Sequence, residues 1–177
     1  MDKKIIFITG GVRSGKSRFA QEIGEKFPSP RAYLATAQAL DDEMKARIER
    51  HQQSRSRTWT TLEEPIRIPE VVQKEGKRFG IILLDCLTLW LSNLMMAGWS
   101  EKKILAAADR LLQSARKASS SYIFVSNEVG MGIVPDNPTA RFFRDVGGRI
   151  HQRVAREADE VYFLMCGLPQ KIKGGRG

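Results

Sequence analysis

Short continuous apolar runs alternate along this chain with longer stretches in which apolar residues recur every three or four positions. The first pattern is typical of strands buried on both faces, and the second is typical of amphipathic helices. The apolar runs predict strands at 5–9, 31–35, 79–84, 122–126 and 160–164, with a short extended piece at 59–64. The longer spacing predicts helices after residue 17, at 42–53, around 71–72, and at 87–97, 104–118 and 139–158.

This alternation of strand and helix favours an α/β fold with a mostly parallel sheet and helices on both faces. The 177 residues show no repeat, linker or shift in composition, so we expect one domain, residues 1–177. The pattern does not determine the order of the strands in the sheet.

Residues 10–17 match the phosphate-loop pattern, and they stand between the first predicted strand and the first helix. The glycines of such a loop let backbone N–H groups surround an anionic phosphate, aided by the positive end of the following helix. Lys16 then reaches the outer phosphates and Ser17 ligates Mg²⁺. We therefore expect a RecA-like phosphate-loop NTPase rather than a ligand-free glycine turn. The expected phosphate-binding residues are Gly10, Gly11, Val12, Arg13, Ser14, Gly15, Lys16 and Ser17.

Two other predicted strands end in candidate site residues. Ligands of open parallel sheets bind beyond the carboxyl ends of the strands, so Ala35, Thr36 and Ala37 are expected to contact the nucleotide. Asp85 follows the most apolar strand and could hold Mg²⁺ directly or through water. It could instead cap the helix that begins near Thr88, and the sequence leaves both possibilities open.

Composition narrows the classes of partner. The net charge of +9 suits nucleotides, but the basic residues are scattered without interleaved aromatics, so nucleic acid is not expected. The chain lacks a run of eighteen apolar residues and a signal-peptide pattern, which predicts a cytoplasmic protein without a membrane span. Cys86 and Cys166 are expected to be buried free thiols. The polar, glycine-rich tail at 171–177 is expected to be frayed.

The predicted helix at 42–53 carries one of the two histidines of the chain. Met44, Ile48 and His51 are spaced by four and three residues and form one stripe, with Arg47 and Arg55 four residues on either side of His51. By spacing alone, His51 is more simply the end of an apolar stripe facing the core than a reactive group.

Three stretches together resemble one enzyme family. They are 9–18, then 35–37 followed by 41–44 and 47–51, and finally 126–135 continuing through 141–145. These stretches are similar to the bifunctional adenosylcobinamide kinase/adenosylcobinamide-phosphate guanylyltransferase of cobalamin biosynthesis, and the resemblance covers nearly the whole chain. Phosphate loops occur in many families, whereas the run Asn-Glu-Val-Gly-Met-Gly-Ile-Val-Pro at 127–135 is specific.

The resemblance implies two reactions on a small-molecule substrate. A triphosphate, ATP or GTP, phosphorylates the aminopropanol hydroxyl of adenosylcobinamide, and GTP then transfers GMP to adenosylcobinamide phosphate through a guanylyl-histidine at His51. Neutral imidazole is a suitable nucleophile near pH 7, and neighbouring arginines favour its neutral form. By the same resemblance, the guanine nucleotide would be lined by Gln52, Gln53, Ser54, Arg55, Glu63 and Asp85.

The resemblance also implies a homotrimer. If GMP is carried on His51 above the phosphate loop, we expect the helix at 42–53 to move on nucleotide binding or a neighbouring subunit to complete the site. Glu128 could bind the substrate arm or orient Mg²⁺, and His151, where the family more often has Asn, is expected to be a surface or packing residue. A corrinoid groove is expected near Trp90, Met95 and Met96 or between subunits.

Two other functions remain compatible with the residues. A small-molecule kinase without guanylyl transfer would phosphorylate its substrate and form no covalent GMP. A RecA-like nucleic-acid-dependent ATPase would be stimulated by single-stranded DNA, with binding that weakens steeply as salt rises.

Overall fold

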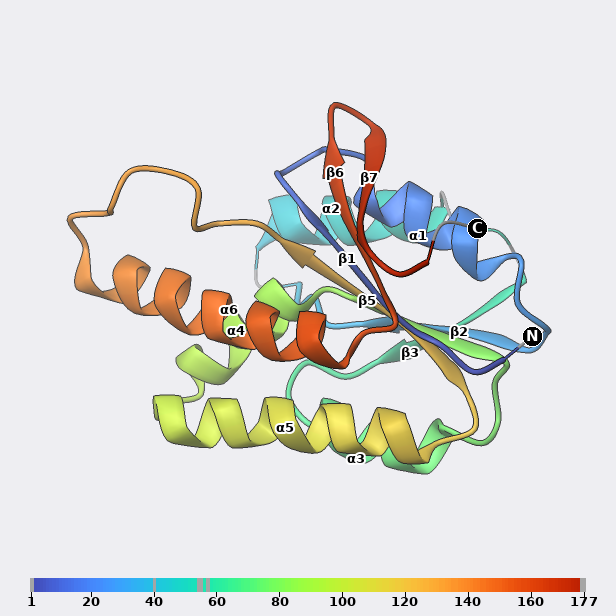
Figure 1. The fold of residues 1–177 in the computed structure, drawn as a ribbon. Helices are drawn as coiled ribbons and strands as arrows, with labels where there is room; N and C mark the ends of the chain where they lie inside the picture. The colour runs from blue at the N-terminus through green and yellow to red at the C-terminus, as the bar shows by residue number, and fades with distance from the viewer. Residues whose placement is uncertain (1, 40, 54–55, 57, 176–177) are drawn as a thin grey trace.

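The computed structural model describes residues 2–39, 41–53, 56 and 58–175. Within this part of the chain, the side chains of Arg47, His51, Gln52 and Gln53 are not described. Figure 1 shows one twisted sheet with helices on both faces. In chain order the elements are β1 (Ile5–Gly10), α1 (Lys16–Gly24), β2 (Arg31–Ala35), α2 (Asp42–Gln53), β3 (Trp59–Glu63), α3 (Ile68–Glu75), β4 (Ile81–Asp85), α4 (Leu87–Met96), α5 (Glu101–Lys117), β5 (Ser121–Asn127), α6 (Pro138–Glu157), β6 (Glu160–Met165) and β7 (Leu168–Lys173).

The strand order in the sheet is β3-β2-β4-β5-β1-β6-β7. Every neighbouring pair is parallel except β6 and β7, so the carboxyl ends of β1 to β6 meet at one edge. β5 lies between β1 and β4, and its last residues pair with the end of each: Gly10 with Asn127, and Asp85 with Val125. The order therefore brings the phosphate loop and Asp85 to the same edge, one strand apart.

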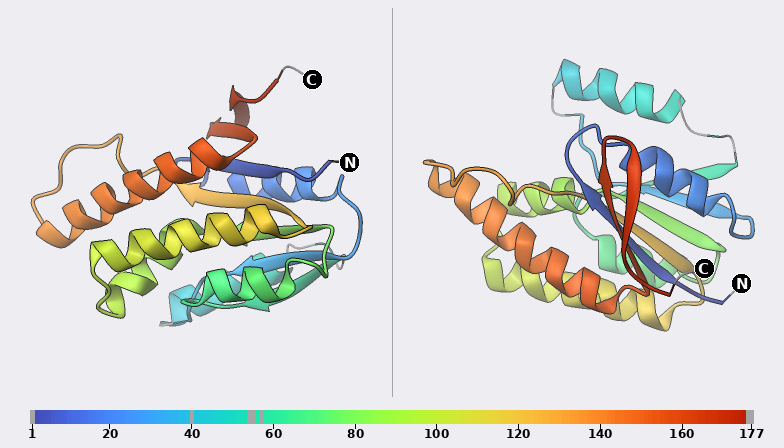
Figure 2. Two further views of the ribbon diagram at one scale, coloured as in Figure 1. Left: turned by 60° about the horizontal axis from the view of Figure 1, so that its bottom comes forward. Right: turned by 45° about the horizontal axis from the view of Figure 1, so that its top comes forward.

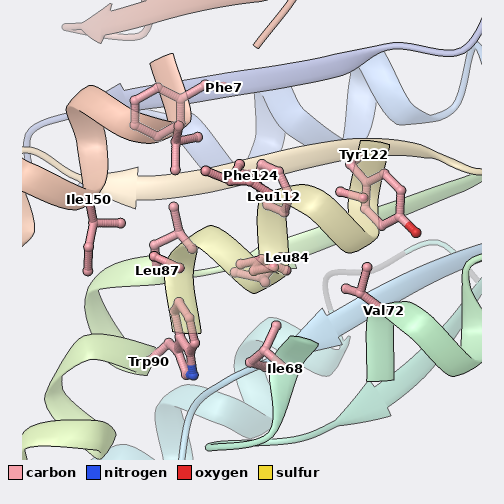
Figure 3. Packing of buried hydrophobic residues seen from close by; sticks show 14 of the residues in the cluster. Phe7, Ile68, Val72, Leu84, Leu87, Trp90, Leu112, Tyr122, Phe124 and Ile150 are labelled. Atoms are coloured by element: carbon pink, nitrogen blue, oxygen red, sulfur yellow. The ribbon is translucent and has the colours of Figure 1, made fainter. Parts of the chain in front are cut away.

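The apolar residues of each strand alternate between two cores. Ile5 and Phe7 of β1 face the side covered by α3 to α6, whereas Ile6 and Ile8 face the side of α1. Figure 3 shows the larger core, where Trp90 of α4 and Leu112 of α5 pack beside Leu84 and Phe124 of the sheet. Because both faces are buried, the central strands read as continuous apolar runs, as the sequence predicts.

The helix α2 lies apart from these cores. It stands on the same side as α1 but farther from the sheet (Figure 2), and none of its described side chains is buried. The predicted stripe of Met44 and Ile48 therefore does not face the core, which corrects the expectation. Among the described residues, no helix is both long and apolar enough to cross a bilayer.

Two expectations about the C-terminal region are wrong. Residues 171–173 of the tail that was expected to be frayed belong to β7, which pairs with β6 through a turn at Cys166 and Gly167. Both turn residues have positive φ, 53° and 82°, and two such residues favour a tight hairpin between twisted strands. Cys166 is exposed at this turn, whereas Cys86 is buried as expected, and both are free thiols.

Candidate functional site

A cavity of about 590 Å³ opens at the carboxyl edge of the sheet. The phosphate loop, strands β2, β3, β4 and β5, and the helix α2 all contribute to its lining. The lining residues are Val12, Arg13, Ser14, Gly15, Lys16, Ser17, Arg18, Tyr33, Ala35, Ala37, Ala39, Met44, Ile48, Glu63, Asp85, Cys86, Leu89 and Asn127. Its volume lies within the range of cofactor and small-molecule sites.

Gly10 and Gly15 shape the phosphate loop, and of the three glycines of the loop only Gly15 is among the residues that line the cavity. Gly10 has φ of 148°, and a Cβ atom there would lie 2.3 Å from the carbonyl oxygen of Leu164 in β6. The backbones of β1 and β6 approach so closely at this point that only glycine fits. Gly15 is the N-cap of α1 with φ of 94°, which turns the chain from the loop into the helix.

Lys16 is folded back onto its own loop. Its ammonium donates to the carbonyl oxygen of Gly11 at 2.5 Å and lies 3.4 Å from Ser14 Oγ, and the residue is only 6% exposed. Burial lowers the pKa of Lys16, and the negative charge of Asp85 opposes this shift. An ammonium held within a phosphate loop can bind phosphate oxygens.

Ser17 and Asp85 converge in the cavity. Ser17 Oγ donates to Asp85 Oδ2 at 2.7 Å, although the two residues are 68 positions apart in the chain. The structure does not support the alternative that Asp85 caps α4, because the N-cap of that helix is Cys86 and no side chain caps it. The expected pair of metal-binding oxygens is thus brought together.

This pair fits Mg²⁺ that arrives with a nucleotide. Mg²⁺ is usually held by one or two protein oxygens, with phosphate oxygens and water completing its coordination. The described residues contain no group of three or more His, Cys, Asp or Glu side chains able to hold a metal ion by themselves. Ser17 and Asp85 would therefore share the ion with the triphosphate.

Thr36 does not line the cavity, contrary to expectation. It is 0% exposed, and its hydroxyl both donates to the carbonyl oxygen of Cys86 and accepts from the amide of Cys86, each at 2.9 Å. The Thr36 carbonyl oxygen accepts from Asn93 Nδ2 at 2.8 Å. Thr36 thus fixes the end of β2 to the β4–α4 junction, while Ala35 and Ala37 on either side line the cavity.

The α2 wall of the cavity contains Met44 and Ile48. His51 lies three residues beyond Ile48, so helical spacing places this position on the same face of α2. The expected side chains of His51, Gln52 and Gln53, together with Ser54 and Arg55, lie outside what the structure describes. Glu63, at the carboxyl end of β3, lines the cavity.

Three polar residues of the cavity were not predicted from the sequence: Arg18, Tyr33 and Asn127. Asn127 is the last residue of β5, and its backbone amide and Nδ2 both donate to Thr88 Oγ1, at 3.3 and 3.2 Å. The rule applied to Thr36 and Asp85, a polar residue just after a buried strand, would have found it. Tyr33 lies inside the apolar run of β2, and its hydroxyl donates to Asp85 Oδ2 at 2.6 Å. No local signal distinguished Tyr33 from a core residue.

His151 and Glu128 make contacts within the protein. His151 Nε2 lies 2.7 Å from Ser126 Oγ and its ring packs at 5.6 Å from that of Phe7, in agreement with a packing role. Burial lowers the pKa of His151, and the charge of Glu128 opposes this shift. The Glu128 carboxylate accepts from the amides of Gly130 and Met131, which folds the start of the specific loop onto itself.

Trp90 cannot line a surface groove for the corrinoid, contrary to expectation. Trp90 is 0% exposed, and its indole N–H donates to the carbonyl oxygen of Ile66 at 2.9 Å. It is therefore a core residue, and of the three residues named for the groove only Met96 is largely exposed.

A phosphate loop follows β1, and Asp85 ends β4, which is separated from β1 in the sheet by β5 alone. This arrangement defines a RecA-like phosphate-loop NTPase. Solved structures with this fold include the flagellar accessory protein FlaH from Methanocaldococcus jannaschii, with a TM-score of 0.55, 13% identity, and coverage of 97% of this chain and 79% of that chain. The RadB recombinase has a TM-score of 0.55 and 16% identity, and the match covers 90% of this chain and 73% of that chain. An ATPase of the type III secretion system of pathogenic bacteria has a TM-score of 0.57 and 14% identity, and the match covers 95% of this chain and 56% of that chain. At these identities the likeness shows the fold alone.

Sequence comparison identifies the family. The family described as cobinamide kinase / cobinamide phosphate guanyltransferase matches residues 6–172. The bifunctional adenosylcobalamin biosynthesis protein CobU of Escherichia coli is 39% identical over 182 residues, covering 96% of this chain and 99% of that protein. The bifunctional adenosylcobalamin biosynthesis protein CobP of Pseudomonas aeruginosa is 38% identical over 167 residues, covering 94% of this chain and 96% of that protein. The chain belongs to this family, which confirms the resemblance seen in its motifs.

Proposed function

We propose that residues 1–177 act as one catalytic domain that phosphorylates adenosylcobinamide with ATP or GTP and then transfers GMP from GTP to the new phosphate. The product is adenosylcobinamide-GDP. Membership of the family supports both activities, and the cavity beside the phosphate loop supports the use of a triphosphate. We place the reaction in the cytoplasm and in a homotrimer.

In the kinase step, the hydroxyl oxygen of the aminopropanol arm attacks the γ-phosphorus of the triphosphate. The bond from that phosphorus to the bridging oxygen breaks, the nucleoside diphosphate leaves, and the hydroxyl proton is released to water. Lys16 and the loop amides bind the phosphate oxygens on which negative charge is concentrated. Ser17 and Asp85 would hold Mg²⁺, which when bound neutralises charge on the phosphates.

In the GMP transfer, a neutral ring nitrogen of His51 attacks the α-phosphorus of GTP. The bond from that phosphorus to the β-phosphate oxygen breaks, and pyrophosphate leaves. A phosphate oxygen of adenosylcobinamide phosphate then attacks the same phosphorus, the phosphorus–nitrogen bond breaks, and neutral His51 is restored. The covalent intermediate divides one displacement into two easier ones.

The observation that carries this assignment is the position of α2. Met44 and Ile48 line the same cavity as the phosphate loop, and His51 falls on their face of the helix by its spacing. A helix packed against the core would have directed this face away from the nucleotide.

A labelling experiment tests the assignment of His51. The chain is incubated with Mg²⁺ and GTP labelled at either the α- or the γ-phosphate and then denatured. We expect label from the α-position to remain covalently attached, in a bond that is labile to acid and stable to alkali, and label from the γ-position to be absent. His51→Ala should abolish the adduct, and His151→Ala, which changes the only other histidine, should retain it. An adduct that persists in His51→Ala would end the assignment.

A further inference from the structure

We propose that Tyr33 is a positioning residue for the metal site, because its hydroxyl holds the Asp85 carboxylate in the orientation that binds Mg²⁺ together with Ser17. The inference rests on the proposed use of a Mg²⁺-triphosphate in this cavity. Tyr33 itself need not contact the ion.

Two hydroxyl groups converge on one oxygen of Asp85. Tyr33 Oη donates to Oδ2 at 2.6 Å and Ser17 Oγ donates to the same atom at 2.7 Å. The donors come from different elements, since Tyr33 belongs to β2, which pairs with β4, and Ser17 belongs to α1. Within the described part of the chain, Asp85 Oδ1 makes no hydrogen bond, so these two contacts alone fix the rotation of the carboxylate.

The Tyr33 ring is itself held in place. Tyr33 is only 2% exposed, and its ring meets that of Trp59 edge-on at a centroid distance of 6.5 Å and an interplanar angle of 86°. Trp59 in turn packs against Gly24 of α1 so closely that a Cβ at Gly24 would lie 2.5 Å from the indole. The hydroxyl therefore sits on a rigid support that extends from β3 through β2 to β4.

The contacts of Ser17 and Tyr33 respond differently to a metal ion. An ion at Ser17 Oγ would take a lone pair of that oxygen and reorient the hydroxyl, which would weaken its hydrogen bond to Asp85. Tyr33 is not a proposed metal ligand, so its hydrogen bond to Asp85 would be retained. Ligating carboxylates depend on such supporting hydrogen bonds, and the loss of one typically weakens metal binding by about 10- to 100-fold.

A simpler explanation is that Tyr33 fills the core of β2 and its hydroxyl takes the nearest acceptor. Under this explanation, removal of the hydroxyl affects stability but leaves metal affinity unchanged. A measurement of metal affinity therefore distinguishes the two explanations, whereas a measurement of activity does not.

The test compares Tyr33→Phe with Tyr122→Phe. Tyr122 is a fully buried tyrosine at the start of β5, where it pairs with Ile82, three residues before Asp85 on the neighbouring strand. Binding of Mn²⁺ to each protein, with and without a non-hydrolysable GTP analogue, is measured by electron paramagnetic resonance, and folding is checked by circular dichroism and melting. We expect Tyr33→Phe to weaken Mn²⁺ binding by about 10- to 100-fold, and Tyr122→Phe to leave it within about twofold. Raising the Mg²⁺ concentration should restore turnover by Tyr33→Phe.

Metal affinity within about twofold of wild type in folded Tyr33→Phe would overturn the inference. If Tyr33→Phe does not fold, a measurement on the wild-type chain tests the inference instead. The hydroxyl proton of Tyr33 should give a downfield, exchange-protected NMR signal that persists when Mg²⁺ and the GTP analogue bind. Rapid exchange of that proton in the metal complex would equally overturn it. If Tyr33→Phe loses metal affinity while the wild-type chain forms no GMP adduct, the proposed function fails and the inference stands.

Discussion

At the scale of single residues, His151 links the stability of the fold to pH. The side chain lies between α6 and β5, where it contacts Ser126 and Phe7. Burial lowers the pKa of His151 below its ordinary value of 6.5, and the nearby charge of Glu128 only partly offsets this. The folded protein therefore binds a proton at this site less readily than the unfolded chain does.

This difference predicts a loss of stability on mild acidification. Well above pH 6.5 the imidazole is neutral in both states, and its contribution is complete. As the pH falls below this value, the unfolded chain takes up a proton first. The free energy of unfolding then decreases by at most about 1.4 kcal/mol per pH unit until the folded-state pKa is reached.

The measurement is a denaturant titration of wild type and His151→Asn between pH 8 and pH 5. The difference between the two proteins at pH 8 is the reference, since His151 does not titrate there. We expect this difference to shift in favour of His151→Asn as the pH is lowered. Parallel stability curves over the whole range would contradict the prediction.

At the scale of elements, the β6–β7 hairpin supports the phosphate loop. The amide of Gly167, in the turn, donates to the carbonyl oxygen of Ser14 at 3.2 Å, and Gly10 packs against the backbone of Leu164. The loop is therefore braced by the last strands of the sheet, a segment that the sequence analysis treated partly as a frayed tail.

We predict that Gly10→Ala damages the site through this contact. The added Cβ would lie 2.3 Å from the Leu164 carbonyl oxygen, so β1 and β6 must separate, and φ at this position is 148°. We expect a loss of about 1–3 kcal/mol in the free energy of unfolding, together with weakened nucleotide binding. Gly11→Ala is the matched control, because a Cβ there meets nothing within 4 Å. Equal stability of the two variants would refute the steric argument.

The helix α2 is predicted to contribute to the site far more than to stability. Because Ile48 lines the cavity and no described side chain of α2 is buried, Ile48→Ala should change the free energy of unfolding by less than about 1 kcal/mol. Leu84→Ala, in the core of β4, should cost about 2–5 kcal/mol. Formation of the GMP adduct by Ile48→Ala should nevertheless fall roughly tenfold, which corresponds to about 1.4 kcal/mol of lost contact. A large loss of stability with normal adduct formation would show that α2 belongs to the core.

At the scale of the whole molecule, it matters whether one subunit or two build the site. The sequence leads us to expect either a movement of α2 or its supply by a neighbour in a homotrimer. Lys16→Ala disables the phosphate loop, and His51→Ala disables the proposed nucleophile. Each variant alone should form no GMP adduct.

Mixed oligomers of these two variants distinguish the alternatives. If a neighbour supplies α2, co-refolded Lys16→Ala and His51→Ala subunits should regain adduct formation at roughly a quarter of their sites, as random assembly of a cyclic oligomer predicts. If each subunit builds its own site, mixing should restore nothing, and α2 should differ in position with and without GTP. Subunit exchange is verified by mass spectrometry of differently tagged chains.

The sequence by itself determined the features that depend on local pattern. The phosphate loop was predicted from its motif, and the helix at 42–53 and the central strands were predicted from hydrophobic spacing with small errors at their ends. This spacing is a local property that reports the type of element. The motifs at 9–18 and 126–135 likewise identified the family, which the comparisons confirmed.

Only the tertiary structure decided which of these residues meet. In the sequence, nothing distinguishes Thr36, just after a strand, or Tyr33, within that strand, from other core or site residues. In the fold, Thr36 is buried against Cys86, and Tyr33 contacts Asp85, 52 positions away. The strand order that places β5 between β1 and β4, the pairing of β7, and the cavity-facing stripe of α2 were equally out of reach. Each depends on hydrogen bonds and packing between segments distant in the chain, and a local pattern shows that a face is covered without showing what covers it.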